Sequence, residues 1–240
     1  MTHARTGHGA VRTRPTTPWQ ADPYTEALRA GRGPLFLRRS DGRLLPLEVE
    51  RWCAAPDAAD LTVLERCRGA VLDIGCGPGR IVAALAARRA TVLGIDVSPA
   101  AVARTVHTGG RAMVGSVFEP LPREGSWDTG LLLDGNIGIG GDPGALLTRA
   151  THILGPSASL IVETAWPDGA ETDDLDERFQ AQVDNGAGAS GPVFTWARLG
   201  AEALARYSRT TCWTPTERWT AGGRSFVVLR RQQRDLPEPP

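Results

Sequence analysis

"VLDIGCGPGR", residues 71–80, starts as an apolar strand and continues as a loop built around three glycines. The run at 70–75 has the near-continuous hydrophobicity of a short strand buried on both faces. Gly75, Gly77 and Gly79 lack a Cβ, so they accept positive φ angles and let a ligand approach the main chain. Pro78 stiffens the turn just before a helix begins. The stretch therefore predicts a ligand-binding turn between a strand and a helix.

The same succession of an apolar strand and a helix repeats along the middle of the chain. Apolar strands are predicted at 70–75, 91–96, 128–135 and 159–164. Helical patterns separate them at 80–90, 98–110 and 142–154. This βαβ alternation predicts an α/β fold with a doubly wound, mostly parallel, Rossmann-like sheet in a three-layer α/β/α sandwich. Two extended runs around Gly222 and Gly223 predict an antiparallel hairpin at the sheet edge.

The flanking segments differ in composition from this central region. Residues 1–21 are predicted to be a disordered tail, with an organellar transit peptide as the alternative, and residues 233–240 a second tail. Residues 22–56 read as an appendage of one helix and one β-hairpin, which either roofs a pocket or only extends the fold. The main domain spans 57–232, and an insertion at 165–197 interrupts its alternation of strands and helices.

Composition narrows the choice of partners. Lys and Arg number 27 and Asp and Glu 27, so the excess positive charge expected of a nucleic-acid-binding protein is missing. Four cysteines without a CxxC pair, and four histidines, make a metal site improbable and reduced thiols in the cytoplasm the better expectation. No apolar run is long enough for a membrane span. The acidic residues between 171 and 176 indicate a solvated face rather than a cation site. The oligomeric state stays open.

Charge at the glycine turn indicates what it binds. A dinucleotide fingerprint requires GxGxxG or a small final residue, whereas this loop is GxGxG followed by Arg80. Asp73 stands two residues before Gly75, where its carboxylate would repel a pyrophosphate and attract a cation. Asp96, at the end of the next strand, is placed to accept ribose hydroxyls, although it also precedes a helix that it could cap. Together the two carboxylates favour a sulfonium or an ammonium over a diphosphate.

Four segments in order, "VLDIGCGPGR", "GIDVS", "GSVFEPLP" and "DTGLLLDGN", resemble class I S-adenosylmethionine-dependent methyltransferases over roughly residues 60–165. The resemblance implies that Asp73 and the Gly75–Gly79 loop, with Cys76, Gly77 and Pro78, hold the amino-acid end of the donor and Asp96 its ribose. Val97 and the segment Ser116, Val117, Phe118 would line the adenine site, and Asp134 is counted among the cofactor contacts. Many relatives have an acidic residue where this chain has Ser116, which leaves the adenine contact there open.

Methyl transfer is an in-line displacement that depends mainly on alignment of the reactants, so a general base is optional. Asp134 and Asn136, after the strand at 128–135, are the candidate catalytic residues because either can accept a hydrogen bond from the acceptor. Asp134 could equally bind a loop amide. Glu163, Trp166 and Trp196 are candidates for binding substrate, against the alternatives of an ion pair with an arginine for Glu163 and core packing for the two tryptophans.

The sequence thus predicts a cytoplasmic methyltransferase that moves a methyl group from S-adenosylmethionine to an O, N or C atom of a small organic molecule, leaving S-adenosylhomocysteine. The alternatives are an NAD(P)-dependent oxidoreductase, a methyltransferase of a peptide or protein, and a module that binds the cofactor without chemistry.

Overall fold

The computed structural model describes residues 18–20, 22–165, 173–188 and 190–231. The predictions for residues 1–17 and 233–240, for Trp166 and for Glu171 lie outside these residues. Residues 18–20, which were assigned to the N-terminal tail, form a short helix. Within the described part, no helix is long and apolar enough to cross a membrane.

The centre of the molecule is a seven-stranded sheet with the order β10-β11-β7-β6-β3-β4-β5. Its strands are β3 (Val71–Ile74), β4 (Val92–Asp96), β5 (Ala112–Val114), β6 (Trp127–Leu132), β7 (Leu154–Thr164), β10 (Trp213–Ala221) and β11 (Arg224–Arg231). The five strands from β7 to β5 run parallel, and β11 is antiparallel to both of its neighbours. Strand order reverses between β3 and β6, which in such sheets is where ligands bind.

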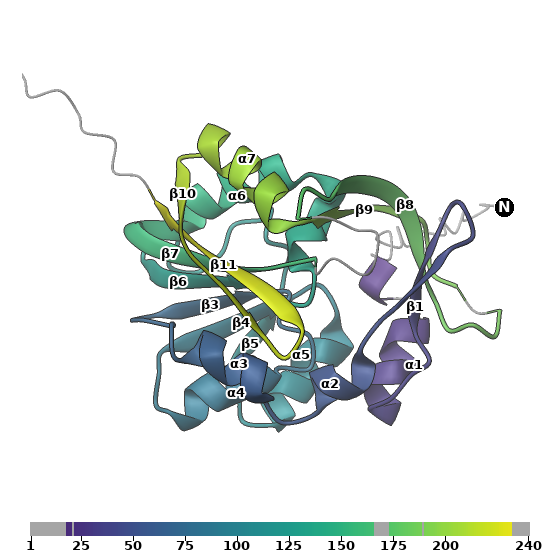
Figure 1. Cartoon of the computed structure of the whole chain (residues 1–240). Helices are drawn as coiled ribbons and strands as arrows, with labels where there is room; N and C mark the ends of the chain where they lie inside the picture. The colour runs from purple at the N-terminus through teal and green to yellow at the C-terminus, as the bar shows by residue number, and fades with distance from the viewer. Residues whose placement is uncertain (1–17, 21, 166–172, 189, 232–240) are drawn as a thin grey trace, which may run out of the picture.

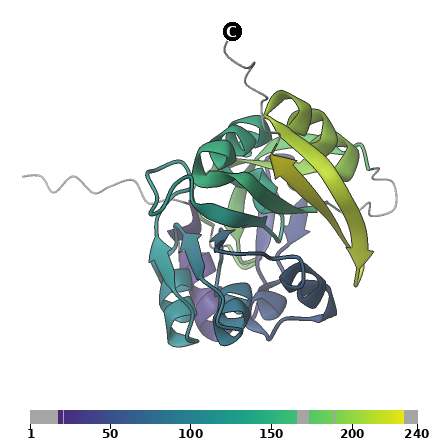
Figure 2. The same cartoon turned by 90° about the vertical axis from the view of Figure 1, so that its left-hand side faces the viewer.

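Helices cover both faces of this sheet (Figures 1 and 2). One face is covered by α3 (Ala58–Leu64), α4 (Arg80–Ala87) and α5 (Pro99–His107), and the other by α6 (Pro143–Ile153) and α7 (Ala201–Thr210). Side chains alternate between the two layers, so Val71 and Leu131 pack toward α4 whereas Leu72 and Leu132 pack toward α6. The predicted three-layer, mostly parallel α/β sheet is confirmed.

The helices begin where the sequence provides caps. Asp57 and Asp60 form a reciprocal capping box at α3, and the Ser98 side chain accepts a hydrogen bond from the Ala101 amide at α5. Asp142 does the same for α6. These caps fix the loops that enter the helices. The loops before α5 and α6 belong to the site described below.

A second, four-stranded antiparallel sheet has the order β2-β1-β8-β9. It combines the hairpin of β1 (Phe36–Arg39) and β2 (Leu44–Pro46) with β8 (Asp176–Asp184) and β9 (Phe194–Leu199) from the predicted insertion. It lies to the right of the main sheet in Figure 1, near η1 (Pro18–Gln20), α1 (Asp22–Ala30) and α2 (Val49–Cys53). The strand β9 packs against η2 (Asn136–Gly141), the short helix that follows β6.

Several boundaries differ from those expected. The strand β6 ends at Leu132 rather than at 135 because Asp134 and Gly135 adopt left-handed backbone angles, with φ of +55° and +82°. The strand β7 starts five residues earlier than the predicted 159. The three-residue strand β5 was not predicted, and neither were β8 and β9.

Candidate active site

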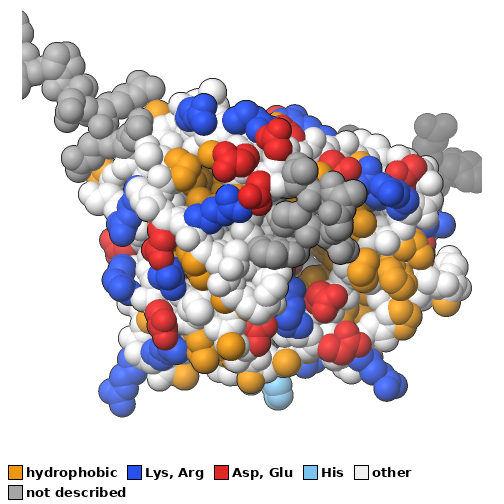
Figure 3. Space-filling model, viewed as in Figure 1, with side chains coloured by type: hydrophobic (Ala, Val, Ile, Leu, Met, Phe, Trp, Pro, Cys, Tyr) orange, Lys and Arg blue, Asp and Glu red, His pale blue; other side chains and the backbone are white. Residues whose placement is uncertain are grey.

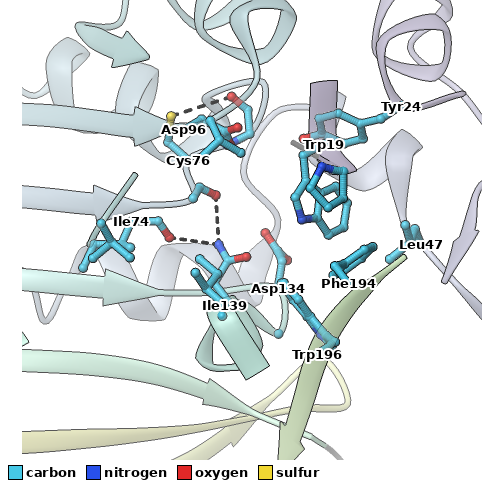
Figure 4. A pocket seen from close by; sticks show the side chains of 18 of the residues that line it. Trp19, Tyr24, Leu47, Ile74, Cys76, Asp96, Asp134, Ile139, Phe194 and Trp196 are labelled. Atoms are coloured by element: carbon cyan, nitrogen blue, oxygen red, sulfur yellow. Dashed lines mark hydrogen bonds between the residues drawn. The ribbon is translucent and has the colours of Figure 1, made fainter. Parts of the chain in front are cut away.

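A cavity of about 490 Å³ opens at the end of the parallel strands, between the main sheet and the second sheet. One side is made by the glycine loop after β3, by the ends of β4 and β5, and by the turn after β6. The other side is made by η1, α1, the β1–β2 hairpin and β9. Figure 4 shows Asp134 between these two sides. The N-terminal hairpin therefore roofs a cavity, which was one of the two expectations for it.

The glycine loop has the backbone geometry that the sequence predicted. Gly75, Gly77 and Gly79 all have positive φ, at +74°, +53° and +86°. A Cβ on Gly75 would lie 2.6 Å from the Asn136 side-chain nitrogen, and a Cβ on Gly79 would overlap Thr105. Gly75, Cys76, Gly77 and Pro78 line the cavity, whereas Gly79 forms the left-handed N-cap of α4. The loop thus presents mostly main chain to a ligand.

Asn136 holds this loop in place. Its side-chain amide donates hydrogen bonds to the carbonyl oxygens of Ile74 at 3.0 Å and Gly75 at 2.9 Å (Figure 4). Asn136 also lines the cavity. This geometry favours a positioning role for Asn136 over the direct catalytic role that the sequence analysis considered.

Asp96 closes the loop from the neighbouring strand. One carboxylate oxygen accepts a hydrogen bond from the Gly77 amide at 2.9 Å, and the other accepts one from the Ser98 amide at 2.8 Å. Burial raises the pKa of Asp96 to about 6, and these backbone donors oppose the rise. The residue lines the cavity, as a ribose-binding carboxylate must. Ser98, rather than Asp96, is the cap of α5.

Asp73 lies beneath the loop, only 3% exposed, and is not among the described residues that line the cavity. Burial raises the pKa of Asp73 to about 7, although the nearby Arg80 lowers it. The charged form is therefore only partly compensated, and a cation at the loop would stabilise it. A contact between Asp73 and an ammonium group stays a prediction.

The predicted adenine segment does reach the cavity. Val97, Ser116, Val117 and Phe118 are all lining residues. The Ser116 hydroxyl accepts a hydrogen bond from the Phe118 amide at 3.2 Å, so it already has a partner in its own turn. Val117 is buried, while Phe118 is 45% exposed and packs where a Cβ on Gly140 would stand. The segment offers mainly apolar contact.

Asp134 is the centre of an ion-pair cluster. Its carboxylate lies 2.6 Å from Arg51, 2.8 Å from Arg80 and 3.6 Å from Arg224. Burial raises the pKa of Asp134, but the positive charges of Arg80 and Arg51 lower it by more. The pKa of Asp134 is therefore below its usual value. A carboxylate with a lowered pKa and three guanidinium partners is a poor proton acceptor. The structure favours the structural alternative for this residue.

The cluster extends away from the cavity. Arg80 makes two hydrogen bonds to Asp60, at 2.8 Å and 2.9 Å, and both side chains are almost fully buried. Glu163 holds Arg224 through both carboxylate oxygens and accepts a hydrogen bond from the Asp134 amide. Glu163 is not among the described lining residues, so the geometry matches the ion-pair alternative for it rather than substrate contact.

Aromatic side chains form the opposite side of the cavity. Trp196, which the sequence analysis selected, lines it together with Phe194 from the same strand. Trp19, Tyr24 and Trp52 also line the cavity but were not selected as site residues. The signal available for them was the concentration of aromatic residues in "PWQADPY" and at position 52 of an otherwise aromatic-poor chain. They reach the site because η1, α1 and α2 pack against the second sheet.

The part of the chain that carries the glycine loop is similar to known methyltransferases. A family model described as "Methyltransferase domain" matches residues 71–156, from β3 into β7. This match covers about a third of the chain and agrees with the resemblance to class I S-adenosylmethionine-dependent methyltransferases rather than with the NAD(P)-dependent oxidoreductase alternative.

Solved structures share the fold at low sequence identity. A methyltransferase from Bacteroides fragilis, in complex with S-adenosylhomocysteine, matches 91% of this chain and 98% of its own at 20% identity, with a TM-score of 0.75. The sugar N-methyltransferase KedS8 from Streptoalloteichus matches 97% and 100% at 18% identity, with a TM-score of 0.57. The 1,6-didemethyltoxoflavin-N1-methyltransferase from Burkholderia thailandensis matches 73% and 77% at 19% identity, with a TM-score of 0.52.

Proposed function

We propose that this protein transfers the methyl group of S-adenosylmethionine to an O, N or C atom of a small organic molecule bound in the cavity. The observation that carries the proposal is the position of the cavity. It lies at the point where strand order reverses and joins the side-chain-poor glycine loop to Asp96 on one side and to an aromatic surface on the other.

The described residues fit the donor. The glycine loop offers backbone where an amino-acid group would lie, and Asp73 beneath it supplies negative charge that burial leaves partly uncompensated. Asp96 would hold the ribose, and Val97 with Ser116, Val117 and Phe118 would flank the adenine. When bound, S-adenosylmethionine supplies an electrophilic methyl group, whose bond to sulfur breaks as an acceptor lone pair forms the new bond. The known structures with S-adenosylhomocysteine or S-adenosylmethionine bound support S-adenosylmethionine as the donor.

The structure's own contribution to the reaction is alignment. Asn136 fixes the carbonyl groups of the loop, and the ion pairs of Asp134 tie the turn after β6 to α2 and α4. Orientation of this kind can lower a barrier by ~7–11 kcal/mol without any proton transfer by the protein. We therefore assign Asp134 and Asn136 positioning roles.

The acceptor class is supported by two observations. The cavity is roofed by the second sheet, which suits a small molecule better than an extended chain. Among the similar structures, the acceptors named are a sugar, an amino pentose and 1,6-didemethyltoxoflavin, which are small molecules. A peptide or protein acceptor remains the competing candidate.

A direct experiment incubates the protein with methyl-labelled S-adenosylmethionine and a cell extract separated into small-molecule and protein fractions. Mass spectrometry should find the label in a small molecule, at a rate that falls when Gly75→Ala replaces the wild-type protein. Label in the protein fraction would favour the competing acceptor. Binding of S-adenosylhomocysteine without any labelled product would indicate a cofactor-binding module without chemistry.

A further inference from the structure

A group of aromatic rings faces the glycine loop across the cavity. We define the aromatic wall as Trp19, Phe194 and Trp196, all of which line the cavity (Figure 4). Trp19 lies 5.5 Å from Phe194 and 5.5 Å from Trp196, measured between ring centroids, and Phe194 lies 5.9 Å from Trp196. Three rings from two distant segments thus converge on one point.

The rings of the wall do not stack on one another. The two pairs that involve Trp19 are tilted by 57°, and Phe194 meets Trp196 at 88°. By contrast, Trp219 and Phe226, beside the core on the other side of the molecule, stack at 18°. A tilted arrangement leaves ring faces without a parallel partner inside the wall. Trp19 and Phe194 are half-buried and offer the accessible faces for a flat ligand, whereas Trp196 is 7% exposed and supports the other two rings.

Aliphatic side chains surround the wall. Leu37, Leu45 and Leu47 from the β1–β2 hairpin and Ile139 from η2 also line the cavity. On the face seen in Figure 3, hydrophobic side chains gather on the right, where Figure 1 places the second sheet, while charged side chains of both signs are mixed elsewhere. The roof side of the cavity is therefore apolar.

The charge next to the wall favours one kind of ligand. Asp134, the carboxylate between the wall and the loop, is paired with Arg51, Arg80 and Arg224. Arg198, two residues after Trp196 on β9, lines the cavity as well. The arginines are balanced by carboxylates, because Asp60 pairs with Arg80, Glu163 with Arg224 and Glu177 with Arg198. Each of these carboxylates is thus already held by guanidinium groups, so a protonated amine would lose its water there without gaining a carboxylate partner, and a neutral ring would not. Aromatic rings alone attract cations, which makes charge the property to test.

We propose that the aromatic wall is the acceptor site and that it selects a flat aromatic molecule without positive charge, such as a phenol or an enol. This inference rests on the proposed function, since the donor must occupy the glycine-loop side of the same cavity.

The test is isothermal titration calorimetry on the full chain saturated with S-adenosylhomocysteine. The three probes are 2-naphthol, its saturated analogue decahydro-2-naphthol, and protonated 2-naphthylmethylamine. We expect 2-naphthol to bind about tenfold tighter than either analogue. Equal affinity for the flat and saturated rings, or tighter binding of the amine, would overturn the proposal.

Substitutions in the aromatic wall test whether 2-naphthol binds there. Trp196→Ala and Trp19→Ala should each weaken 2-naphthol binding about tenfold, while Trp196→Phe retains most of it. Leu44→Ala is the control, because Leu44 is on the same hairpin, 46% exposed and outside the described lining. All variants should keep the wild-type affinity for S-adenosylhomocysteine, which shows that they fold.

The two proposals fail in different ways. If the wild-type protein does not bind S-adenosylhomocysteine, both are overturned. If it binds S-adenosylhomocysteine but the wall variants bind 2-naphthol as the wild type does, only the acceptor site is overturned.

Discussion

The side chain of Asn136 lies so close to Gly75 that it donates a 2.9 Å hydrogen bond to the Gly75 carbonyl and leaves no room for a Cβ on that residue. The contact joins the turn after β6 to the loop after β3, the two strands between which the order of the sheet reverses.

Gly75→Ala should damage the loop both locally and functionally. The new Cβ would stand 2.6 Å from Asn136 in a residue with φ of +74°, so we expect a loss of about 1–3 kcal/mol in the free energy of unfolding. S-adenosylhomocysteine binding should weaken at least about tenfold. Gly42→Ala is a matched control, since Gly42 has φ of +86° but nothing within 4 Å of its Cβ position. Denaturant unfolding and calorimetry measure the two effects, and equal loss of affinity in both variants would contradict the account.

Asn136→Asp separates a positioning role from a catalytic one. Aspartate has nearly the same shape but cannot donate to the carbonyls of Ile74 and Gly75 when ionised, so the loop should loosen. We expect the affinity for S-adenosylhomocysteine to fall about tenfold. If Asn136 acts instead by accepting a hydrogen bond from the acceptor, cofactor affinity will stay at the wild-type value.

Asp60→Asn should be among the most destabilising single changes at the site. Asp60 is fully buried and pairs with Arg80, whose side chain is 5% exposed, so removing its charge takes one of two carboxylate partners away from a buried guanidinium group. We expect a cost of about 3–5 kcal/mol in the free energy of unfolding. Asp174→Asn, which breaks the exposed pair with Arg206, should leave the free energy of unfolding almost unchanged. Similar costs for the two variants in urea unfolding would refute the buried network.

Stability and ligand binding should respond to pH in opposite directions. Burial raises the pKa of Asp73 to about 7 and that of Asp96 to about 6, above the value of about 3.9 in an unfolded chain. The folded state therefore holds more protons between about pH 4 and 7, and the unliganded protein should lose stability as pH rises through that window.

A bound ligand should make the ionised form of Asp73 more favourable than the protonated form. An ammonium group favours the ionised carboxylate, so S-adenosylhomocysteine should bind more tightly as pH rises from about 5.5 to 8. Asp73→Asn should flatten most of both pH dependences, raise the melting temperature at pH 8 and weaken the ligand. Unchanged pH curves in this variant would exclude Asp73 as the group responsible.

The parts of the structure that follow local patterns could be predicted from the sequence. The glycine loop, Asp96 and four strands of the sheet were predicted because each depends on residues within one strand-turn-helix unit. The caps Asp57, Ser98 and Asp142 act within four residues of their own position, so their signal is local, although Asp96 and not Ser98 was considered as the cap of the helix at 98–110.

The remaining features depend on distant pairings. Arg51 reaches Asp134 across 83 positions in the sequence, and no local pattern indicates that contact. The hairpin pairs with β8 in the insertion, more than a hundred residues later, which is why the second sheet and the roles of Trp19 and Tyr24 were missed. At three residues, β5 is too short to give a periodic signal.

The central claim is that the cavity beside Gly77 and Asp96 binds the sulfur nucleoside. The most direct measurement is a pair of calorimetric titrations at pH 8, S-adenosylhomocysteine and NADH, into the wild-type protein and Asp96→Asn. We predict that S-adenosylhomocysteine saturates a single site, that Asp96→Asn weakens it at least about tenfold, and that NADH gives no binding heat. Binding of NADH in place of S-adenosylhomocysteine, or an unchanged affinity in Asp96→Asn, would contradict the claim.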